Sequence, residues 1–304
     1  MKNPDVSIII VNYNVKGLLL KCLGSIYKTI GDLQIEVIVV DNSSDDGSVD
    51  AVRNQFSEVV VIANTINAGF PAANNQALYL AKGEYIFLLN PDTELIEDSI
   101  SILKNFLENS SSAAIAAPKL LNSDRSIQRS IFRFPRIWFI ITEMFYLESM
   151  SMNRYYSEMD MKTVFEVDSA SGAALFFRKS LTDKIGILNE KLFWIEDIDF
   201  CYRTKISGGK VFYVPSTSIV HHSGQSAKKN YNVSISNQVI NKIKFYKVHR
   251  NSAVLIIVQF ISFINVIMRI IIFGLLSPFK KVYLLKLKAY VYTLPYIFTA
   301  TKNL

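Results

Sequence analysis

The chain has 304 residues, half of them hydrophobic, so it can bury a sizeable core as one large domain or one domain with an appendage. Its two cysteines, Cys22 and Cys201, lie far apart, which excludes a disulfide-rich framework and indicates a reducing compartment. The net charge of +7 is uneven, because residues 228–304 hold twelve Lys and Arg but no Asp or Glu. The first 227 residues are therefore slightly acidic. This distribution argues against a general nucleic-acid-binding protein and suits an anionic membrane surface better.

The first 90 residues predict buried strands that alternate with helices. The expected strands are 6–11, 36–40, 59–63 and 85–89, and the expected helices are 18–30, one from about 48, and 71–82. This order predicts an α/β fold with a doubly wound, mostly parallel sheet. Because a strand-like run begins within a few residues of the start, we expect no signal peptide. Loops rich in Asn, Asp and Ser follow the strands, where ligands bind in such sheets.

The fourth strand ends in Asn-Pro-Asp at residues 90–92. A carboxylate at this position, Asp92, can hold a hard divalent cation, and the cation can hold a diphosphate. The first loop is Asn-Tyr-Asn at residues 12–14, and the sequence contains neither a glycine-rich dinucleotide fingerprint nor a P-loop. A metal would replace such a loop. The alternative is that residues 90–92 form only a turn and that Asp92 caps the next helix.

Four motifs in order resemble one known family. They are Val-Asn-Tyr-Asn at 11–14, Val-Asp-Asn-Ser-Ser-Asp-Asp-Gly-Ser at 40–48, Asn67-x-Gly69-Phe70 with Asn74-Asn75, and Asn-Pro-Asp-Thr at 90–93. Together they resemble the family 2 inverting glycosyltransferases, which have the GT-A fold, and especially the rhamnosyltransferase-like branch that builds bacterial cell-surface polysaccharides. The resemblance covers about residues 5–230. Each motif is weak alone, but four at these spacings are specific.

The resemblance implies a donor site for a nucleoside-diphosphate sugar at the edge of the sheet. It places Tyr13 near the nucleobase, Asp41 on the imide edge of the base, and Asn90 near the ribose. An aromatic face can stack on a pyrimidine, and a carboxylate can accept from an N–H group. The residues assigned to the donor are Asn12, Tyr13, Asp41, Asn42, Asn67, Gly69, Asn74 and Asn90. Loop capping is the alternative for these polar residues, since Asn is common in turns.

The middle of the chain combines expected strands and one helix with an irregular stretch. A helix that begins after Asp98 and runs to about 109 is expected, together with strands at 113–117, 167–178 and 211–214. Residues 120–165 look irregular and rich in aromatic and basic groups. That stretch is either a surface subdomain with its own small core, or a lip that meets an amphiphilic acceptor or the membrane interface. Gly172 would allow close backbone approach. The resemblance places its segment under the acceptor site, although an ordinary strand is the alternative.

A dense acidic cluster occupies residues 193–203, with three carboxylates beside Phe193 and Trp194. Inverting transfer needs one base within hydrogen-bond reach of the attacking hydroxyl. The resemblance implies Asp197 as this base with Glu196 nearby, and we expect Trp194 to contact the acceptor sugar. Helix N-capping is the alternative for the cluster. Asp199 and Arg203, four residues apart, could simply pair on a helix.

A late histidine pair follows the last expected strand. The resemblance implies that His221 joins Asp92 on the metal, with His222 as the spare, although a lone histidine is more often structural. Because the other ligands are oxygens, the metal should be Mg²⁺ or Mn²⁺.

The C-terminal residues predict a basic helix at 236–249 and a long apolar run at 253–276. Four polar residues interrupt the run, and at 100° per residue they fall within about 120° of one helix face. These residues are Gln259, Ser262, Asn265 and Arg269. The run is borderline for a membrane span. The polar stripe favours a helix that lies in the membrane interface or packs in a helical pair; a helix that covers the body or a dimer partner is the alternative.

These observations predict a GT-A domain at 1–230, divided into a nucleotide-sugar half (1–117) and an acceptor half (118–230). Residues 231–304 would form basic, apolar helices that associate with a membrane or a second copy. The expected reaction moves one sugar, best rhamnose from dTDP-rhamnose or another sugar from a UDP donor, to a saccharide or lipid-linked glycan. We expect a peripheral protein on the inner face of the cytoplasmic membrane that binds no nucleic acid. A sugar nucleotidyltransferase and a catalytically inactive binding protein are the alternatives.

Overall fold

The computed structural model describes residues 3–144, 156, 160–222, 231–299 and 301. The chain divides into two compact units. The sheet unit consists of Met1–Arg133, Tyr155–Glu190 and Glu196–Ser223. The helical unit consists of Phe134–Arg154, Lys191–Ile195 and Gly224–Leu304. Residues 134–154 and 191–195, which the sequence analysis assigns to the acceptor half, thus group with the C-terminal helices.

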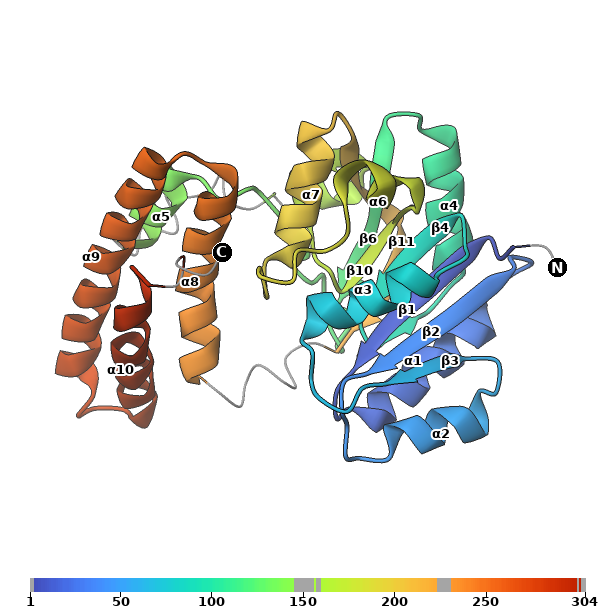
Figure 1. Ribbon diagram of the computed structural model, residues 1–304, viewed down its shortest axis with the longest axis horizontal. Helices are drawn as coiled ribbons and strands as arrows, with labels where there is room; N and C mark the ends of the chain where they lie inside the picture. The colour runs from blue at the N-terminus through green and yellow to red at the C-terminus, as the bar shows by residue number, and fades with distance from the viewer. Residues whose placement is uncertain (1–2, 145–155, 157–159, 223–230, 300, 302–304) are drawn as a thin grey trace. The chain divides into compact units, whose positions relative to one another are not determined.

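The sheet unit is built on one mixed, mostly parallel sheet (Figure 1). In its described part nine strands pair in the order β3-β2-β1-β4-β10-β6-β11-β5, with β8 beside β11. The strands are β1 (Val6–Asn12), β2 (Ile35–Asp41), β3 (Val60–Ala63), β4 (Tyr85–Leu89), β5 (Thr93–Leu95), β6 (Ala113–Leu121), β8 (Phe165–Val167), β10 (Ala174–Arg178) and β11 (Lys210–His221). A separate short pair joins β7 (Ile131–Phe132) to β9 (Ser169–Ala170).

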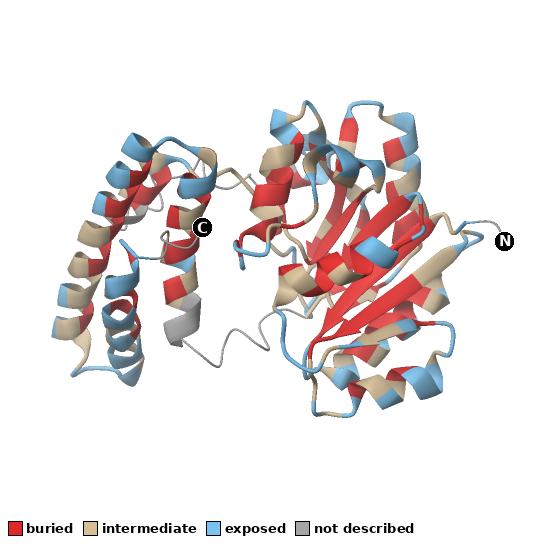
Figure 2. Cartoon of the chain, in the orientation of Figure 1, coloured by how far each residue is buried: buried red, intermediate tan, exposed pale blue. Residues whose placement is uncertain are grey.

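Helices cover both faces of this sheet, which is why its central strands are continuous apolar runs. The helices of the sheet unit are α1 (Lys16–Thr29), α2 (Ser48–Gln55), α3 (Phe70–Leu80), α4 (Ser99–Asn109), α6 (Ser180–Ile185) and α7 (Glu196–Ile206). On one face, α1 and α4 pack in the same core as Ile8, Ile10 and Phe87. On the other face, Phe200 of α7 packs on Phe177 of β10 at a centroid distance of 5.0 Å. Figure 2 shows these strands buried along nearly their whole length.

The predicted α/β class with a mostly parallel sheet is confirmed, and the four N-terminal strands lie close to their predicted positions. Two expectations for the second half are wrong. The single strand expected at 167–178 is broken around Gly172, and the supposedly irregular stretch 120–165 contains β7 and α5 (Ile137–Met144). The last strand also continues past residue 214 to His221, because its second part pairs with both β5 and β6.

The described part of the helical unit contains α5, three further α-helices and a short 3-10 helix at Leu294–Tyr296. The three further α-helices are α8 (Tyr231–His249), α9 (Ser252–Leu276) and α10 (Lys281–Thr293). Asn251 caps α9, since its Oδ1 accepts from the backbone N–H of Val254 at 3.0 Å. Phe273 of α9 stacks on Tyr290 of α10 with centroids 5.8 Å apart. One described helix, α9, is long and apolar enough to cross a membrane by length and composition alone.

Candidate active site at the carboxyl edge of the sheet

The predicted donor residues lie where β1, β2 and β4 end. These strands are parallel, and Asn12 pairs in register with Asp41. Asn12 Nδ2 donates to Asp41 Oδ1 at 2.7 Å, and the backbone N–H of Ser44 donates to Asp41 Oδ2 at 2.8 Å. Asn12 and Asp41 are buried, whereas Tyr13 is half exposed. The buried pair therefore shapes the rim of the edge, and Tyr13 is left available for stacking.

A second loop is held against this rim through Asn42. Its Oδ1 accepts from Asn64 Nδ2 at 3.0 Å and from the N–H of Ala68 at 3.3 Å, and its Nδ2 donates to the carbonyl of Gly69. Asn67 is exposed, and its Oδ1 accepts from the N–H of Gly69 at 2.9 Å. Gly69 has φ +84°, a value that favours glycine. In this structure Asn42, Asn67 and Gly69 shape the loop before α3; their roles in donor binding remain predictions.

The asparagine pair of α3 is buried. Asn74, predicted to line the donor pocket, donates to the carbonyl of Phe70 within its own helix. Asn75 binds residues far away in the sequence. Its Nδ2 donates to the Leu188 carbonyl and to Glu190 Oε1, both at 2.9 Å, and its Oδ1 accepts from the Leu188 N–H at 3.1 Å. Asn75 thus fixes the segment that leads towards α7. Local sequence patterns do not indicate this role, because Leu188 lies 113 positions from Asn75.

Asp92 and His221 are brought together at this edge, as predicted. His221 ends β11, which pairs with β5 directly after Asp92. The distance from His221 Nε2 to Asp92 Oδ1 is 3.2 Å, and both side chains are largely buried. His222 instead contacts Ser123 and Glu94.

The hydrogen bonds of Gln128 determine which nitrogen of His221 carries hydrogen. Gln128 Nε2 donates to the His221 carbonyl oxygen at 3.2 Å, so its Oε1 is the atom that faces His221 Nδ1, at 2.7 Å. Nδ1 is then the donor, and in the neutral ring Nε2 is an acceptor that lies 3.2 Å from Asp92 Oδ1 and 3.4 Å from Asn90 Nδ2. Two acceptors this close require a cation or a proton between them.

A divalent cation fits this donor set. A metal-binding histidine usually donates its other ring N–H to an oxygen, as His221 does to Gln128. Asn90 Oδ1 is buried and has no hydrogen-bond partner among the described residues. No cluster of three or more His, Cys, Asp or Glu able to hold a metal occurs in the part of the chain that the structure describes. A metal here would therefore rest on Asp92 and His221, and oxygens of the donor would complete its coordination.

Asp197 is held in a shaped socket. Its Oδ2 accepts from the N–H of Gly172 at 2.8 Å and its Oδ1 from the N–H of Ile198 at 2.7 Å. A Cβ at position 172 would lie 3.3 Å from the Asp197 Cβ, so glycine permits this close approach. Burial raises the pKa of Asp197 above its ordinary value, and the two N–H donors oppose the rise. A carboxylate in this environment is a stronger base than an exposed one.

The two acids lie at the same edge of the sheet. Gly172 holds Asp197, and the next residue, Ala173, accepts a hydrogen bond from the backbone N–H of Asn90 at 2.9 Å. Ala174 pairs in register with Leu89 at the end of β4. A short chain of contacts therefore joins Asp197 to the loop that carries Asp92.

The other acidic residues of α7 differ in their surroundings. Glu196 and Asp199 are both buried. Asp199 pairs with Arg203, whose Nη2 lies 2.7 Å from Asp199 Oδ2, as the four-residue spacing allowed. Arg203 also donates to the carbonyls of Ile185 and Ile187, so this ion pair fastens α7 to the preceding loop. Asp199 therefore has a structural role: its ion pair with Arg203 holds α7 in place.

Trp194 belongs to the helical unit and lies two residues before α7. Its backbone φ is +77°, which is uncommon for a large side chain, and its side chain is 39% exposed. Such strained positions cluster at functional sites. The predicted contact of Trp194 with an acceptor remains a prediction.

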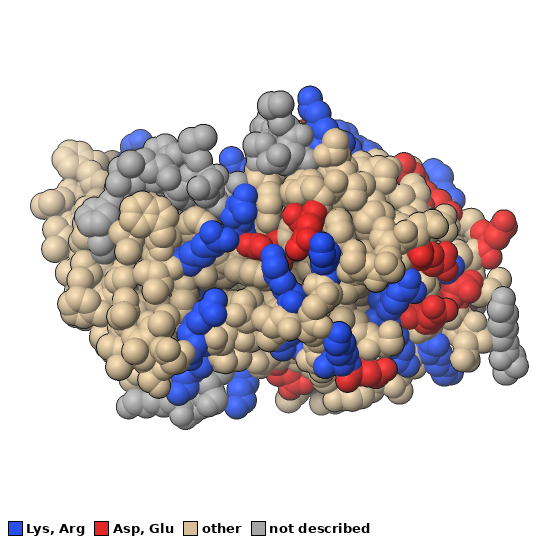
Figure 3. Space-filling model, turned by 90° about the horizontal axis from the view of Figure 1, so that it is seen from above, with Lys and Arg blue, Asp and Glu red and all other residues tan. Residues whose placement is uncertain are grey.

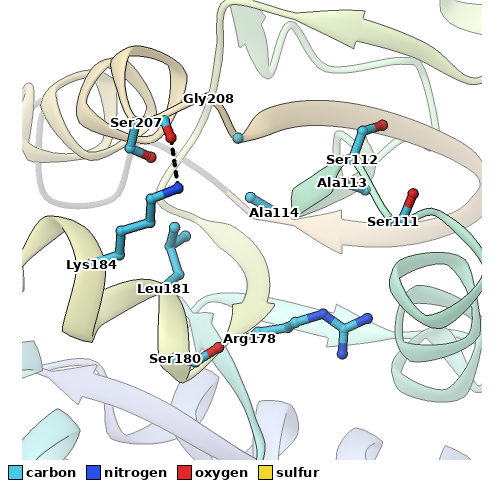
Figure 4. Close-up of a pocket in the computed structure, with 11 residues that line it drawn as sticks. Ser111, Ser112, Ala113, Ala114, Arg178, Ser180, Leu181, Lys184, Ser207 and Gly208 are labelled. Atoms are coloured by element: carbon cyan, nitrogen blue, oxygen red, sulfur yellow. Dashed lines mark hydrogen bonds between the residues drawn. The ribbon is translucent and has the colours of Figure 1, made fainter.

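A cleft elsewhere on the sheet unit is not part of this site. It has a volume of about 280 Å³ and is lined by residues such as Ser112, Arg178 and Lys184 (Figure 4). Arg178 pairs with Tyr85 at the start of β4, so the cleft lies at the amino edge of the sheet. Lys184 donates to the Ser207 carbonyl at 2.6 Å.

Two curated relatives match part of this chain. A relative from Bacillus spizizenii, poly(ribitol-phosphate) beta-glucosyltransferase, is 34% identical over 134 residues, which are 42% of this chain and 21% of the relative. A relative from Mycobacterium tuberculosis, N-acetylglucosaminyl-diphospho-decaprenol L-rhamnosyltransferase, is 24% identical over 212 residues, 64% of this chain and 69% of the relative. The chain thus spans about a fifth of the first relative and two thirds of the second.

Solved structures share the fold. A mannosyltransferase from Pyrobaculum calidifontis in complex with GDP-Man and Mn²⁺ has a TM-score of 0.58 at 15% identity, covering 99% of this chain and 88% of that one. GalNAc-T7 with UDP, GalNAc and Mn²⁺ has a TM-score of 0.57 at 16% identity, covering 81% and 50%. These likenesses support the predicted GT-A architecture. The family description of glycosyl transferase family 2 matches residues 7–186. The chain therefore belongs to glycosyl transferase family 2, which confirms the predicted family and enzyme class.

Proposed function

We propose that this glycosyltransferase moves one sugar from a nucleoside-diphosphate donor to a hydroxyl group of a saccharide or lipid-linked glycan, with inversion at the anomeric carbon. The observation that carries the proposal is the short chain of contacts between the Asp197 socket and the Asn90 loop. This chain of contacts supports the proposal, because it brings the half-buried carboxylate of Asp197 and the loop that carries Asp92 to one edge of the sheet, where ligands of open α/β sheets bind.

The donor end would be organised by Asp92 and His221, which would hold Mg²⁺ or Mn²⁺. When bound, the metal acts as a Lewis acid that stabilises the departing nucleoside diphosphate. The side-chain oxygens of Asn12 and Asn90 are buried without hydrogen-bond partners among the described residues. Asn12 ends β1, and Asn90 directly follows β4, which pairs with β1. Two unpaired acceptors at adjacent strand ends support a ligand that donates hydrogen bonds there.

Asp197 would act as the base. Its carboxylate takes the proton from the acceptor hydroxyl, while that oxygen bonds to the anomeric carbon and the bond from this carbon to the diphosphate oxygen breaks. A single displacement of this kind inverts the anomeric centre. The N–H groups of Gly172 and Ile198 hold the carboxylate in one orientation, which supports positioning of the base before the acceptor arrives.

For the donor and acceptor, the proposal is rhamnose from dTDP-rhamnose, with UDP-sugars as the second donor class. The rhamnosyltransferase from Mycobacterium tuberculosis supports this choice, and its name describes a diphospho-decaprenol acceptor. The Gln-x-x-Arg-Trp motif of processive synthases is missing from the sequence, so one sugar per encounter is proposed. The reaction would take place at the inner face of the cytoplasmic membrane.

The decisive experiment compares Asp197→Asn with one control and with a variant of the neighbouring acid. Asp183→Asn changes an exposed carboxylate on α6, and Glu196→Gln tests the neighbouring acid. We expect Asp197→Asn to lower kcat by roughly 10²- to 10⁴-fold, with donor binding retained, and Asp183→Asn to match the parent. Donor binding is followed as the rise in melting temperature with dTDP-rhamnose or UDP-glucose and Mn²⁺.

Two outcomes would contradict the proposal. Normal transfer by Asp197→Asn, with loss of transfer in Glu196→Gln, would move the base to Glu196. No stabilisation by any nucleoside-diphosphate sugar would favour an inactive binding protein.

A further inference from the structure

The polarity of α9 is opposite to that of a helix on the surface of a water-soluble protein. Its polar stripe, which predicted a helix in the membrane interface or in a helical pair, lies inside the helical unit. Gln259 Nε2 donates to the Ile297 carbonyl at 3.1 Å. Arg269 Nε donates to Asn265 Oδ1 at 2.7 Å, and its Nη1 donates to the Tyr290 hydroxyl at 3.2 Å. Surface helices normally turn such residues to water and their apolar residues inward.

The outward face of α9 is apolar. Its most exposed large side chains are between 48% and 72% accessible; they are Ile256, Ile257, Phe260, Ile271 and Leu275. At 100° per residue they fall within an arc of about 100°, opposite the polar stripe. Only 28% of the most apolar 18-residue window of α9 is buried. A core helix of a water-soluble protein would be mostly buried, so this face is built to meet an apolar environment.

Basic residues border this face at both ends. Lys247 and Arg250 precede α9, Lys280 and Lys281 follow it, and all four are exposed. Residues 228–304 contain no acidic residue. At the left of Figure 3 the surface of the helical unit is mostly uncharged. The charged side chains drawn on it are Lys and Arg. Each Lys or Arg near an anionic membrane surface strengthens binding by about fivefold.

We propose that the helical unit docks on an anionic phospholipid bilayer, with α9 lying in the membrane plane and its outward face inserted at the boundary between headgroups and acyl chains. A second copy of the chain is a poorer occupant for this face, because it would bring two basic borders together. The bilayer offers both an apolar interior and negative headgroups. This inference does not depend on the proposed sugar transfer.

An in-plane position fits better than a spanning one. With 25 residues, α9 is about 37 Å long, enough to cross a hydrocarbon core of about 30 Å. However, its inner face contacts α5, α8 and α10. A span would carry α10, with its exposed Lys288, into the hydrocarbon, where a charge is costly. A helix with one apolar face outward needs only shallow insertion.

Vesicle flotation of the full chain tests this inference. The parent is mixed with vesicles of phosphatidylcholine alone or with 30% phosphatidylglycerol, a composition chosen as roughly that of an anionic membrane surface. The test variant is Ile256→Ser/Phe260→Ser/Leu275→Ser. The matched control, Tyr79→Ser/Leu80→Ser/Ile206→Ser, changes three exposed apolar residues of the sheet unit. We expect the parent and the control to float with anionic vesicles, and the test variant to lose on the order of 100-fold in partition coefficient.

Melting curves of all proteins verify folding, which exposed polar substitutions should leave intact. A charge variant, Lys280→Gln/Lys281→Gln, should weaken binding to anionic vesicles about 10-fold or more and leave the weaker binding to neutral vesicles unchanged. The proposal fails if the parent does not float, or if the test variant floats as well as the parent. It also fails if the parent is a dimer that does not float and the test variant is a monomer, which would assign the face to a second copy.

Discussion

The close contact between Gly172 and Asp197 makes a small substitution informative. Gly172→Ala would place a methyl carbon 3.3 Å from the Asp197 Cβ and 3.6 Å from its Oδ2. The backbone at 172 does not have a positive φ, so alanine is allowed there and the only strain is this contact. Asp197 must then move by a few tenths of an ångström, away from the N–H that holds it.

The size of the effect follows from this displacement. A misplacement of about 1 Å at a reacting centre costs about 100-fold in rate, so a few tenths of an ångström should lower kcat by about 4- to 10-fold. Donor affinity should stay at the parent value, because the substitution touches the base rather than the donor residues. The loss should thus appear in kcat at saturating donor.

The assay measures transfer from the donor that stabilises the parent best, with donor binding followed separately by thermal shift. Gly24→Ala on α1 is the matched control, since no atom lies within 4 Å of the added carbon. A Gly172→Ala enzyme with the parent's kcat would show that the position of Asp197 does not limit the reaction. A loss confined to donor affinity would show that Gly172 belongs to the donor site instead.

Three further predictions follow from the same contacts. Only the ionised carboxylate of Asp197 can accept a proton, and burial raises its pKa above the ordinary value of 3.8. We therefore expect kcat/KM to rise with pH through a midpoint above 3.8. A pH profile with its midpoint at or below that value would contradict the assignment. Gln128→Leu should weaken Mn²⁺-dependent donor binding about 10- to 100-fold by releasing His221, whereas the exposed control Gln34→Leu should not; equal Mn²⁺ titrations would contradict this. Asn75→Ala should lower the free energy of unfolding by about 1–3 kcal/mol in urea titrations, because buried backbone groups lose their partner, and an effect below about 0.5 kcal/mol would refute that role.

Local patterns were sufficient for the nucleotide half of the sheet unit. Continuous apolar runs that end in polar loops predict buried parallel strands, and parallel strands must bring their carboxyl ends to one edge. The positions of Asp41, Asn90 and Asp92 at that edge follow from this rule. The dense acidic cluster also drew attention to Asp197 before any contact was known.

The partners of these residues were beyond the reach of local patterns. Gln128 meets His221 across 93 positions, and Asn75 meets Leu188 across 113. Short-range spacing carries no information about such pairs, because they form only when separate strands and loops pack. The same reason applies to the break in the strand at Gly172, whose backbone N–H donates to Asp197 of α7 instead of to a neighbouring strand.

Helix α9 shows most clearly which features the sequence can predict and which depend on packing. The order of residues is enough to predict that α9 is a long apolar helix with one polar stripe, because the period of a helix fixes which residues share a face. The packing of the helices is needed to show that the stripe points inward to α10 and that Phe260 and Leu275 point outward. Periodicity defines the faces of a helix but not which of them is covered, since that depends on the polar groups that the neighbouring helices present.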